Sequence, residues 1–224
     1  MSSIIMRNKF FKNIYLIIMA SYKCISEHYE KCFEAYGDTP QGVDWPNEED
    51  MYKRYDIMLD VITDNSKEVT LLDFGCGTGR LLDYIQRKKL NIKYSGLDIS
   101  EKYYKYCKEK YPNVTFYNID IMTSNLDRLP TFDYVVMNGV FTEKREMSEE
   151  QMFSFISTML NKIYQKINNG LAFNVMSPIV DFKRDDLFYL SYDRLGFFLK
   201  DNLSRNYIIN ANYGLWEYTT YVYK

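Results

Sequence analysis

The sequence predicts an open α/β fold in which strands and helices alternate and a hairpin closes the sheet. An apolar run from Val69 to Leu72 ends in Asp73 and a glycine-rich turn, after which a helical pattern begins at Arg80. Four further apolar runs of strand length follow, mostly separated by segments with helical periodicity. The pattern ends in a strand–turn–strand sequence over residues 207–223. At 224 residues, the chain is long enough for one domain with an N-terminal extension.

The composition is that of a globular protein with a formal net charge of −2 and no long basic block. This balance argues against a large nucleic-acid footprint, so no nucleic-acid partner is expected. The four cysteines show no C-x-x-C pairing, which indicates reduced thiols in a cytoplasmic protein. His28 is the only histidine, so no metal site is expected.

Residues 1–20 carry three cations followed by the apolar run 14–20. The run is too short to cross a membrane, and no stable membrane insertion is expected. An amphipathic helix, or a translation start near Met19, is the favoured interpretation, and a secretory signal is the alternative.

Residues 1–47 are expected to form an N-terminal helical extension or lid, and residues 48–224 the main domain. The Gly, Asp and Pro content of residues 21–45 predicts a loop. Two interpretations of this loop stay open: a lid over a site, or a surface loop pinned by a tryptophan. The imidazole and aromatic side chains that it carries include His28, Tyr29 and Trp45.

Capping residues predict where several helices begin and end. Asn47 and Ser100 each precede a helical pattern and are predicted N-caps. Ser148 with Gln151 predicts a capping box at the start of a long amphipathic helix, and Gly170 is the predicted end of that helix.

The turn Asp73-Phe74-Gly75-Cys76-Gly77-Thr78-Gly79 places a glycine at every second position. Glycines there allow positive φ angles and close approach of a ligand to the backbone, and the helix that follows offers free N–H groups. The dinucleotide fingerprint G-x-G-x-x-G fails, because Arg80 stands where its third glycine belongs. A nicotinamide dehydrogenase is therefore disfavoured.

Two acids follow the next strands. Asp98 ends the second predicted strand about 20 residues beyond the last glycine, where a ribose-binding acid belongs. A carboxylate at that place accepts hydrogen bonds from both ribose hydroxyls. Asp120 follows the third predicted strand, at a position typical of a second ligand contact or of an ordinary turn.

The D-x-G-x-G-x-G pattern resembles motif I of the class I S-adenosylmethionine (SAM) dependent methyltransferases. The resemblance covers residues 48–224 and includes Asp98 and Asp120. It implies a Rossmann-like, seven-stranded, mostly parallel sheet with an antiparallel last strand. It also implies SAM as the cofactor and S-adenosylhomocysteine (SAH) as the product.

The same resemblance implies a set of cofactor contacts. Arg54 would meet the methionine carboxylate of SAM, with a solvated arginine as the alternative, and Asp120 would meet the adenine amino group. The full set is Arg54, Asp73, Gly75, Cys76, Gly77, Gly79, Asp98, Ile99, Asp120, Ile121 and Asn138.

The fourth predicted strand, 132–138, resembles motif IV of the family, whose end faces the transferred methyl group. Enzymes that methylate bases or glutamine carry Asn/Asp-Pro-Pro-Tyr/Phe there. This chain has Asn138-Gly139-Val140-Phe141 instead, which argues against both kinds of substrate.

The acceptor determines what else the site needs. A sugar hydroxyl needs a general base, for which His28 and Glu143 are the candidates. A phosphate or phosphoramidate oxygen needs no base and prefers cations, and the chain offers Lys144, Arg145, Lys183 and Arg184. The substrate-binding residues that we predict are Tyr29, Trp45, Lys144 and Arg145.

Residues 42–50, 139–144 and 171–178 resemble small methyltransferases encoded among bacterial capsule and O-antigen genes. The resulting hypothesis is methyl transfer to an oxygen of a small, phosphorylated or nucleotide-linked surface-polysaccharide precursor. The alternatives are a SAM-binding partner subunit without turnover and an RNA methyltransferase.

Overall fold

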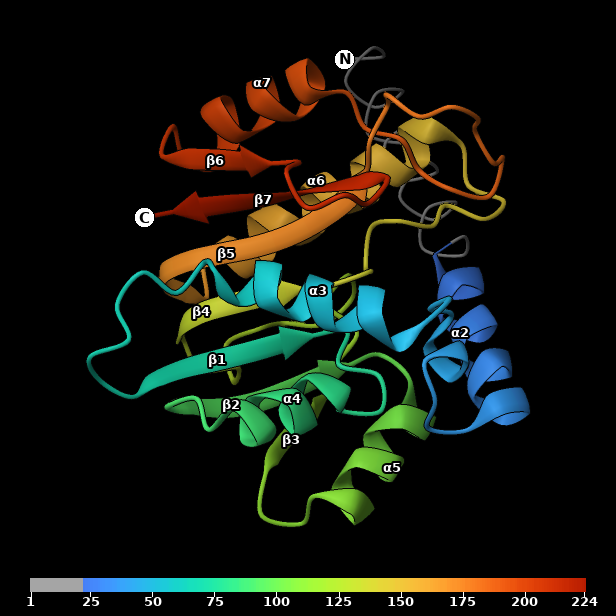
Figure 1. Cartoon of the computed structure of the whole chain (residues 1–224). Helices are drawn as coiled ribbons and strands as arrows, with labels where there is room; N and C mark the ends of the chain where they lie inside the picture. Colours follow the sequence, from blue (N-terminus) through green and yellow to red (C-terminus); the bar gives the residue numbers. More distant parts are fainter. Residues whose placement is uncertain (1–21) are drawn as a thin grey trace, which may run out of the picture.

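The structure is a computed structural model, and it describes residues 22–224 (Figure 1). The helix expected in residues 1–20 lies outside this range. The helices are α2 (Lys23–Tyr36), the short 3₁₀ helix η1 (Gln41–Val43), α3 (Glu48–Leu59), α4 (Arg80–Lys88), α5 (Glu101–Lys110), α6 (Glu149–Tyr164) and α7 (Tyr192–Asn202). The strands are β1 (Val69–Phe74), β2 (Ile92–Asp98), β3 (Thr115–Asn118), β4 (Phe132–Met137), β5 (Ile167–Met176), β6 (Tyr207–Asn210) and β7 (Glu217–Tyr223).

The strands form one seven-stranded sheet in the order β3-β2-β1-β4-β5-β7-β6. Neighbours from β3 to β5 pair in parallel, and β7 runs antiparallel to both β5 and β6. The predicted open α/β fold with an antiparallel last strand is thus confirmed. The strand order reverses at β1, whose neighbours are β2 and β4. In open α/β sheets a ligand crevice lies at the carboxyl ends of the strands at such a reversal.

Apolar residues of the central strands are buried on both faces of the sheet, as expected for parallel strands covered by helices. Leu71 and Val136 pack with α3 and α4 in one core cluster. Leu72 and Val135 point the other way and pack with α6 and α7 in a second cluster. Figure 1 shows the two helix layers on opposite faces of the sheet.

Residues 21–45 are only partly a loop, which corrects the prediction. Lys23–Tyr36 forms α2, because the turn-forming residues are confined to the stretch that follows it. Gly37 ends the helix with a φ of 62°, and its N–H donates to the carbonyl of Phe33 at 2.8 Å. Within residues 22–224, no helix is long and apolar enough to cross a membrane.

The prediction that Gly170 ends a helix is wrong. Helix α6 ends at Tyr164, and Gly170 lies inside β5 between Tyr134 of β4 and Tyr223 of β7. A Cβ atom at Gly170 would lie 3.1 Å from both the Tyr223 ring and Val61, and 3.2 Å from the Tyr134 ring. The glycine is needed there for close packing in the sheet.

The capping box of α6 is present as predicted. The Ser148 hydroxyl accepts from the Gln151 N–H at 3.2 Å, and the Gln151 side chain accepts from the Ser148 N–H at 2.8 Å. We expect Ser148→Ala to lower the free energy of unfolding by about 1 kcal/mol, because an N-terminal N–H of α6 loses its partner. Urea denaturation measures the change.

Ser157→Ala is the matched control on the same helix. Its hydroxyl is buried without a hydrogen-bond partner among the described residues, so its loss should leave stability unchanged or raise it. Equal destabilisation by both variants would contradict the capping argument.

Candidate functional site

A cavity of about 920 Å³ lies at the carboxyl ends of β1, β2 and β4, where the strand order reverses. Its floor is the glycine turn, with Gly75 and Gly77, together with Asp98 and the loop after β4. Its roof comes from α2 and the segment after it. The roof residues are Tyr22, Ile25, Ser26, Tyr29, Val43 and Trp45. We call this space the glycine-loop cavity.

All three glycines of the turn have positive φ angles, of 76°, 52° and 78° for Gly75, Gly77 and Gly79. A Cβ on Gly75 would lie 2.8 Å from Val140, whereas one on Gly79 would lie 2.7 Å from the ring of Tyr111. Gly75 and Gly77 therefore shape the cavity. Gly79 serves the packing of α4 against α5, and it lines neither of the cavities described here.

Asp98 is 8% exposed and lines the glycine-loop cavity. Its carboxylate accepts hydrogen bonds from the N–H groups of Gly77 and Ser100, both at 2.9 Å. Burial raises the pKa of Asp98 to about 6, although these backbone hydrogen bonds lower it. The group is a carboxylate at neutral pH and is placed to accept further hydrogen bonds from a ligand.

Asp120, Ile121, Ile99 and Asn138 also line this cavity, as predicted for ligand contacts. Asp120 accepts from the Tyr22 hydroxyl at 2.6 Å and from the Met122 N–H at 3.0 Å. The Asn138 side-chain oxygen is buried and has no hydrogen-bond partner among the described residues. A buried acceptor of this kind is costly unless a ligand donates to it.

Two other predicted contacts lie away from the cavity. Asp73 is 4% exposed and accepts from the Tyr94 hydroxyl at 2.8 Å; burial raises its pKa to about 7. The Cys76 thiol forms a hydrogen bond with the Cys107 thiol. This hydrogen bond and burial raise the pKa of Cys76 well above its ordinary value. Asp73 and Cys76 are therefore part of the packing beneath β1 and the glycine turn and do not line the glycine-loop cavity.

A second cavity, of about 1090 Å³, adjoins the first and shares Tyr29, Val43 and Trp45 with it. We call it the outer cavity. Tyr29 and Trp45 therefore lie at the boundary between the two cavities. Its lining includes three carboxylates and two guanidinium groups, namely Asp44, Glu143, Glu217, Arg54 and Arg184.

Arg54 lines the outer cavity and not the glycine-loop cavity. Its Nε lies 3.0 Å from both carboxylate oxygens of Glu217, and its guanidinium stacks on the Trp45 ring at 4.1 Å. Its charge is therefore paired, while its buried Nη1 has no partner among the described residues. The Nη1 atom is therefore the part of Arg54 that is available for the predicted contact with a ligand carboxylate.

Glu217 continues into a buried chain of hydrogen bonds. It accepts from the Asn174 side chain at 2.9 Å, and the Asn174 oxygen accepts from the Gly139 N–H at 2.7 Å. Trp45 lies on the other side of Gly139, because a Cβ there would come within 3.0 Å of the Trp45 ring. The chain therefore links the outer cavity to the loop after β4 that lines the glycine-loop cavity.

Glu143 is 6% exposed and lines the outer cavity. Burial and a hydrogen bond with Asp44 raise its pKa to about 7, while its ion pair with Arg145 opposes the rise. A buried carboxyl that titrates near neutral pH is suited to take up or release a proton.

The cations predicted to bind substrate are placed differently from the expectation. Lys144 and Arg145 line neither cavity. Arg145 contacts the carboxylates of Glu143, Asp44 and Asp186 instead. Arg184 lines the outer cavity but is paired with Asp186 at 2.5 Å. The side chains of Arg145 and Arg184 thus pair with carboxylates of the protein itself.

His28 lines neither cavity, but its Nε2 lies 2.9 Å from Asp44 and 3.5 Å from the Cys32 sulfur. The ligand atoms of His28, Cys32 and Asp44 lie within 4.8 Å of one another, a spacing that suits a metal ion. However, the Arg145 guanidinium lies 3.4 Å from the same Asp44 oxygen and would repel a cation there. The expectation of no metal is kept as a prediction.

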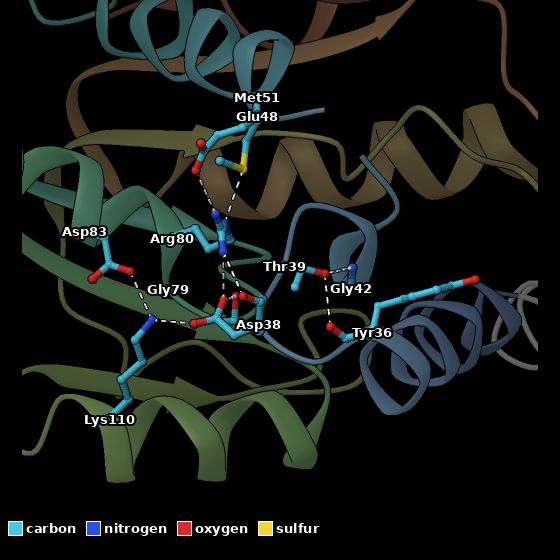
Figure 2. Close-up of polar contacts among 12 residues, drawn as sticks. Tyr36, Asp38, Thr39, Gly42, Glu48, Met51, Gly79, Arg80, Asp83 and Lys110 are labelled. Carbon is cyan, nitrogen blue, oxygen red and sulfur yellow. Dashed lines mark hydrogen bonds and ion pairs between the residues drawn. The ribbon is translucent and has the colours of Figure 1, made fainter. Parts of the chain in front are cut away.

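The roof is tied to the main domain by Asp38, a residue that the sequence analysis did not single out. Its carboxylate accepts from Thr78 at 2.8 Å, Tyr106 at 2.9 Å and Lys110 at 2.6 Å, and it pairs with Arg80 at 3.2 Å. Figure 2 shows Arg80 and Lys110 converging on it from α4 and α5. Burial would raise the pKa of Asp38, but these hydrogen bonds outweigh it and lower that pKa.

We expect Asp38→Asn to destabilise the protein by about 2 kcal/mol at pH 7, because charged hydrogen bonds in a half-buried site are lost. A lowered folded-state pKa stabilises the fold above the pKa of the unfolded chain. The difference between variant and parent should therefore shrink as the pH falls through the folded-state pKa of Asp38. Urea denaturation at several pH values measures it.

Glu34→Gln is the control on the same N-terminal segment. Glu34 pairs with Lys102 at the surface, 61% exposed, so its loss should have no measurable effect. If the loss of unfolding free energy caused by Asp38→Asn did not change with pH, the charge of Asp38 would not stabilise the fold, and the prediction would be wrong.

Comparisons with known proteins agree with this architecture. A family model described as a methyltransferase domain matches residues 71–162, from β1 into α6. A protein named "Putative methyltransferase Rv1506c" from Mycobacterium tuberculosis is 28% identical over 155 residues, which cover 68% of this chain and 91% of that protein.

Solved structures show the same fold at low identity. The Burkholderia thailandensis 1,6-didemethyltoxoflavin-N1-methyltransferase, with its substrate and SAH bound, superposes with a TM-score of 0.61 at 15% identity, over 91% of this chain and 90% of that one. The plantazolicin methyltransferase BpumL in complex with SAH gives 0.59 at 14% identity, over 98% and 99%.

The motif, the strand order and these matches agree with one another. The matched region contains the glycine turn, Asp98, Asp120 and the loop after β4, which are the parts that line the glycine-loop cavity. Together these findings support a class I SAM-dependent methyltransferase, with SAM as the methyl donor and SAH as the product.

Proposed function

We propose that the protein transfers a methyl group from SAM to an oxygen of a small molecule held in the outer cavity, and that Glu143 takes up the acceptor proton. One observation carries this proposal. A buried carboxyl with a pKa of about 7 lines a cavity that shares Tyr29, Val43 and Trp45 with the glycine-loop cavity. A hydroxyl is a poor nucleophile at neutral pH, and such a base removes its proton.

The residues of the glycine-loop cavity fit the parts of SAM. Asp98 would accept from the ribose hydroxyls, and Asp120 with Ile99 and Ile121 would bound the adenine. The unpaired oxygen of Asn138 would accept from the amino group of the methionine portion. From the adjoining outer cavity, the free Nη1 of Arg54 would meet the carboxylate of that portion. When bound, SAM supplies a methyl group already activated on a sulfonium.

The chain's own contribution is therefore positioning, exclusion of water and proton transfer. The roof segment of residues 22–46 covers the glycine-loop cavity, and we assign residues 1–47 to a lid over the 48–224 domain. Tyr29 and Trp45 would hold the acceptor at the boundary between the two cavities. Gly139, which approaches Trp45 closely, would lie near the transferred methyl group.

The charges of the outer cavity favour a neutral or cationic acceptor over a phosphate. Its three carboxylates exceed its two guanidinium groups, and each guanidinium is already paired. The hydroxyl of a sugar in a surface-polysaccharide precursor fits this lining better than the phosphoramidate oxygen of the same kind of molecule. An amine is the second candidate, because the same carboxyl takes a proton from an ammonium group.

A panel of sugar nucleotides and amino sugars, with SAH release as the readout, tests the proposal directly. Turnover with a hydroxyl-bearing member supports it. SAH release only with RNA would favour the RNA methyltransferase alternative. Tight SAM binding without turnover on any member would favour a non-catalytic partner subunit.

We expect Asp98→Asn to weaken SAH binding at pH 8 by about tenfold to a hundredfold, because hydrogen bonds to a charged acceptor are lost. In the parent protein, affinity should fall as the pH drops below about 6, where Asp98 becomes protonated. Calorimetric titrations at pH 5 and pH 8 measure both effects.

Asp127→Asn is the control, because this exposed acid contacts only Asn125 among the hydrogen bonds described. Affinity that does not change between pH 5 and pH 8 in the parent protein would refute the ribose assignment.

We expect Glu143→Gln to lower kcat by roughly a hundredfold or more, the usual contribution of a general base. In the parent protein, kcat should rise as the pH increases through about 7, because only the ionised carboxylate accepts a proton. The variant should lack this rise. Glu146→Gln, an exposed neighbour in the same loop, should leave both rate and pH profile unchanged.

A further inference from the structure

Tyr22 joins the roof of the glycine-loop cavity to the loop that follows β3. Its side chain is 4% exposed and lines this cavity. Its hydroxyl donates to Oδ2 of Asp120 at 2.6 Å, across 98 residues of sequence. Asp120 lines the same cavity, just beyond the end of β3. A roof residue is therefore in direct contact with a carboxylate that faces the cavity.

Packing fixes the position of the Tyr22 ring. The ring stacks on that of Phe155 of α6, with 5.2 Å between the ring centroids and 18° between the ring planes. Both side chains belong to the core cluster on the α6 face of the sheet. A buried, stacked ring has already lost its rotamer freedom, so the hydrogen bond of its hydroxyl costs little further entropy. The Tyr22 hydroxyl is thus preorganised to donate to Asp120.

The Asp120 carboxylate is held from a second side as well. The Met122 N–H donates to its Oδ1 at 3.0 Å, so each carboxylate oxygen has a donor. The loop itself is braced from α6, because the Lys162 ammonium donates to the carbonyls of Ile121 at 2.7 Å and Met122 at 3.0 Å. A carboxylate has about four lone-pair sites, so acceptor sites remain for a ligand. Asp120 therefore offers acceptors, and no donor, to the cavity.

We infer that Tyr22 is a positioning residue for the adenine of SAM, because its hydroxyl holds the Asp120 carboxylate in the orientation that accepts from the 6-amino group. This inference rests on the proposed function, in which Asp120 bounds the adenine. Tyr22 acts through Asp120. Selection of adenine over a 6-oxo purine is then a joint property of the roof and the main domain, since neither residue achieves it alone.

The chemistry of the purine edge explains why the orientation of Asp120 matters. Adenine carries an amino donor at C6, which a carboxylate accepts. A 6-oxo purine carries an acceptor at the same place, and two acceptors that face each other in a buried site both stay unpaired. A site built to hydrogen-bond one group rejects an analogue that lacks it. This rejection requires a fixed carboxylate, because one that is free to rotate can turn away from the carbonyl.

The test compares SAH with its 6-oxo analogue, S-inosylhomocysteine. Calorimetry measures both dissociation constants, the weaker ligand by competition, and the readout is the analogue's constant divided by that of SAH. We expect Tyr22→Phe, which keeps the stacked ring, to weaken SAH binding about tenfold and to leave binding of the analogue within about twofold of the parent value. The ratio should therefore fall, because the analogue does not use the hydrogen bond that Tyr22 supports.

Tyr52→Phe is the matched control. It also removes a phenol–carboxylate hydrogen bond of 2.6 Å, to Glu48, but Tyr52 lines neither cavity. Both dissociation constants should stay at their parent values in this variant. Equal weakening of the two ligands by Tyr22→Phe would mean that Tyr22 only supports the roof, and it would overturn the inference. Parent-like binding of SAH to Tyr22→Phe would overturn it too.

Asp120→Asn separates failure of this inference from failure of the proposed function. The amide adds a donor where the carboxylate has none, so we expect the variant to bind SAH more weakly and the 6-oxo analogue more tightly than the parent protein does. If the ratio stays at the parent value, the adenine does not lie at Asp120, and the proposed placement of SAM fails together with the inference. If Asp120→Asn lowers the ratio but Tyr22→Phe does not, the placement stands and the role of Tyr22 fails.

Discussion

The hydrogen bonds and ion pairs of Asp38, which we call the ionic latch, hold the N-terminal roof segment against the main domain. The latch joins the N-terminal segment to Thr78 in the glycine turn and to Arg80 and Lys110 on two helices of the main domain. The sheet alone gives the floor of a nucleotide site. The roof comes from residues 22–46, which also pair with the main domain through Glu30, Glu34 and Asp44. The latch is half-buried, so its hydrogen bonds are stronger than those of a surface ion pair.

The two cavities are coupled through side chains that they share. Trp45 packs on Gly139 and under the guanidinium of Arg54, which is paired with Glu217. Asn174 connects Glu217 to the Gly139 N–H, so the loop after β4 is held from both sides. Tyr29, Val43 and Trp45 form the boundary between the two cavities. Alignment of the two reactants depends on such a preorganised boundary.

Charge in the outer cavity is arranged in pairs, and one carboxyl remains able to titrate near neutral pH. Arg54 neutralises Glu217, and Arg184 neutralises Asp186. Glu143 is shared between Arg145 and Asp44, and burial raises its pKa to about 7. A site of this kind suits proton transfer better than phosphate binding. Arg145 and Arg184, two of the basic residues that suggested an anionic acceptor in the sequence, are paired with carboxylates of the protein.

The sequence by itself determined the strand–turn–helix at Asp73–Arg80, the helix caps at Asn47, Ser100 and Ser148, and the acids that end β2 and β3, because these signals are local in the chain. It also carried the family motif, and with it the cofactor. Only the tertiary structure decided the rest. Glu217 lies 163 residues from Arg54, and Lys110 lies 72 residues from Asp38. Pairings over such distances leave no periodic pattern in the sequence. Gly170 looked like a helix end because its sheet neighbours were not visible in the sequence.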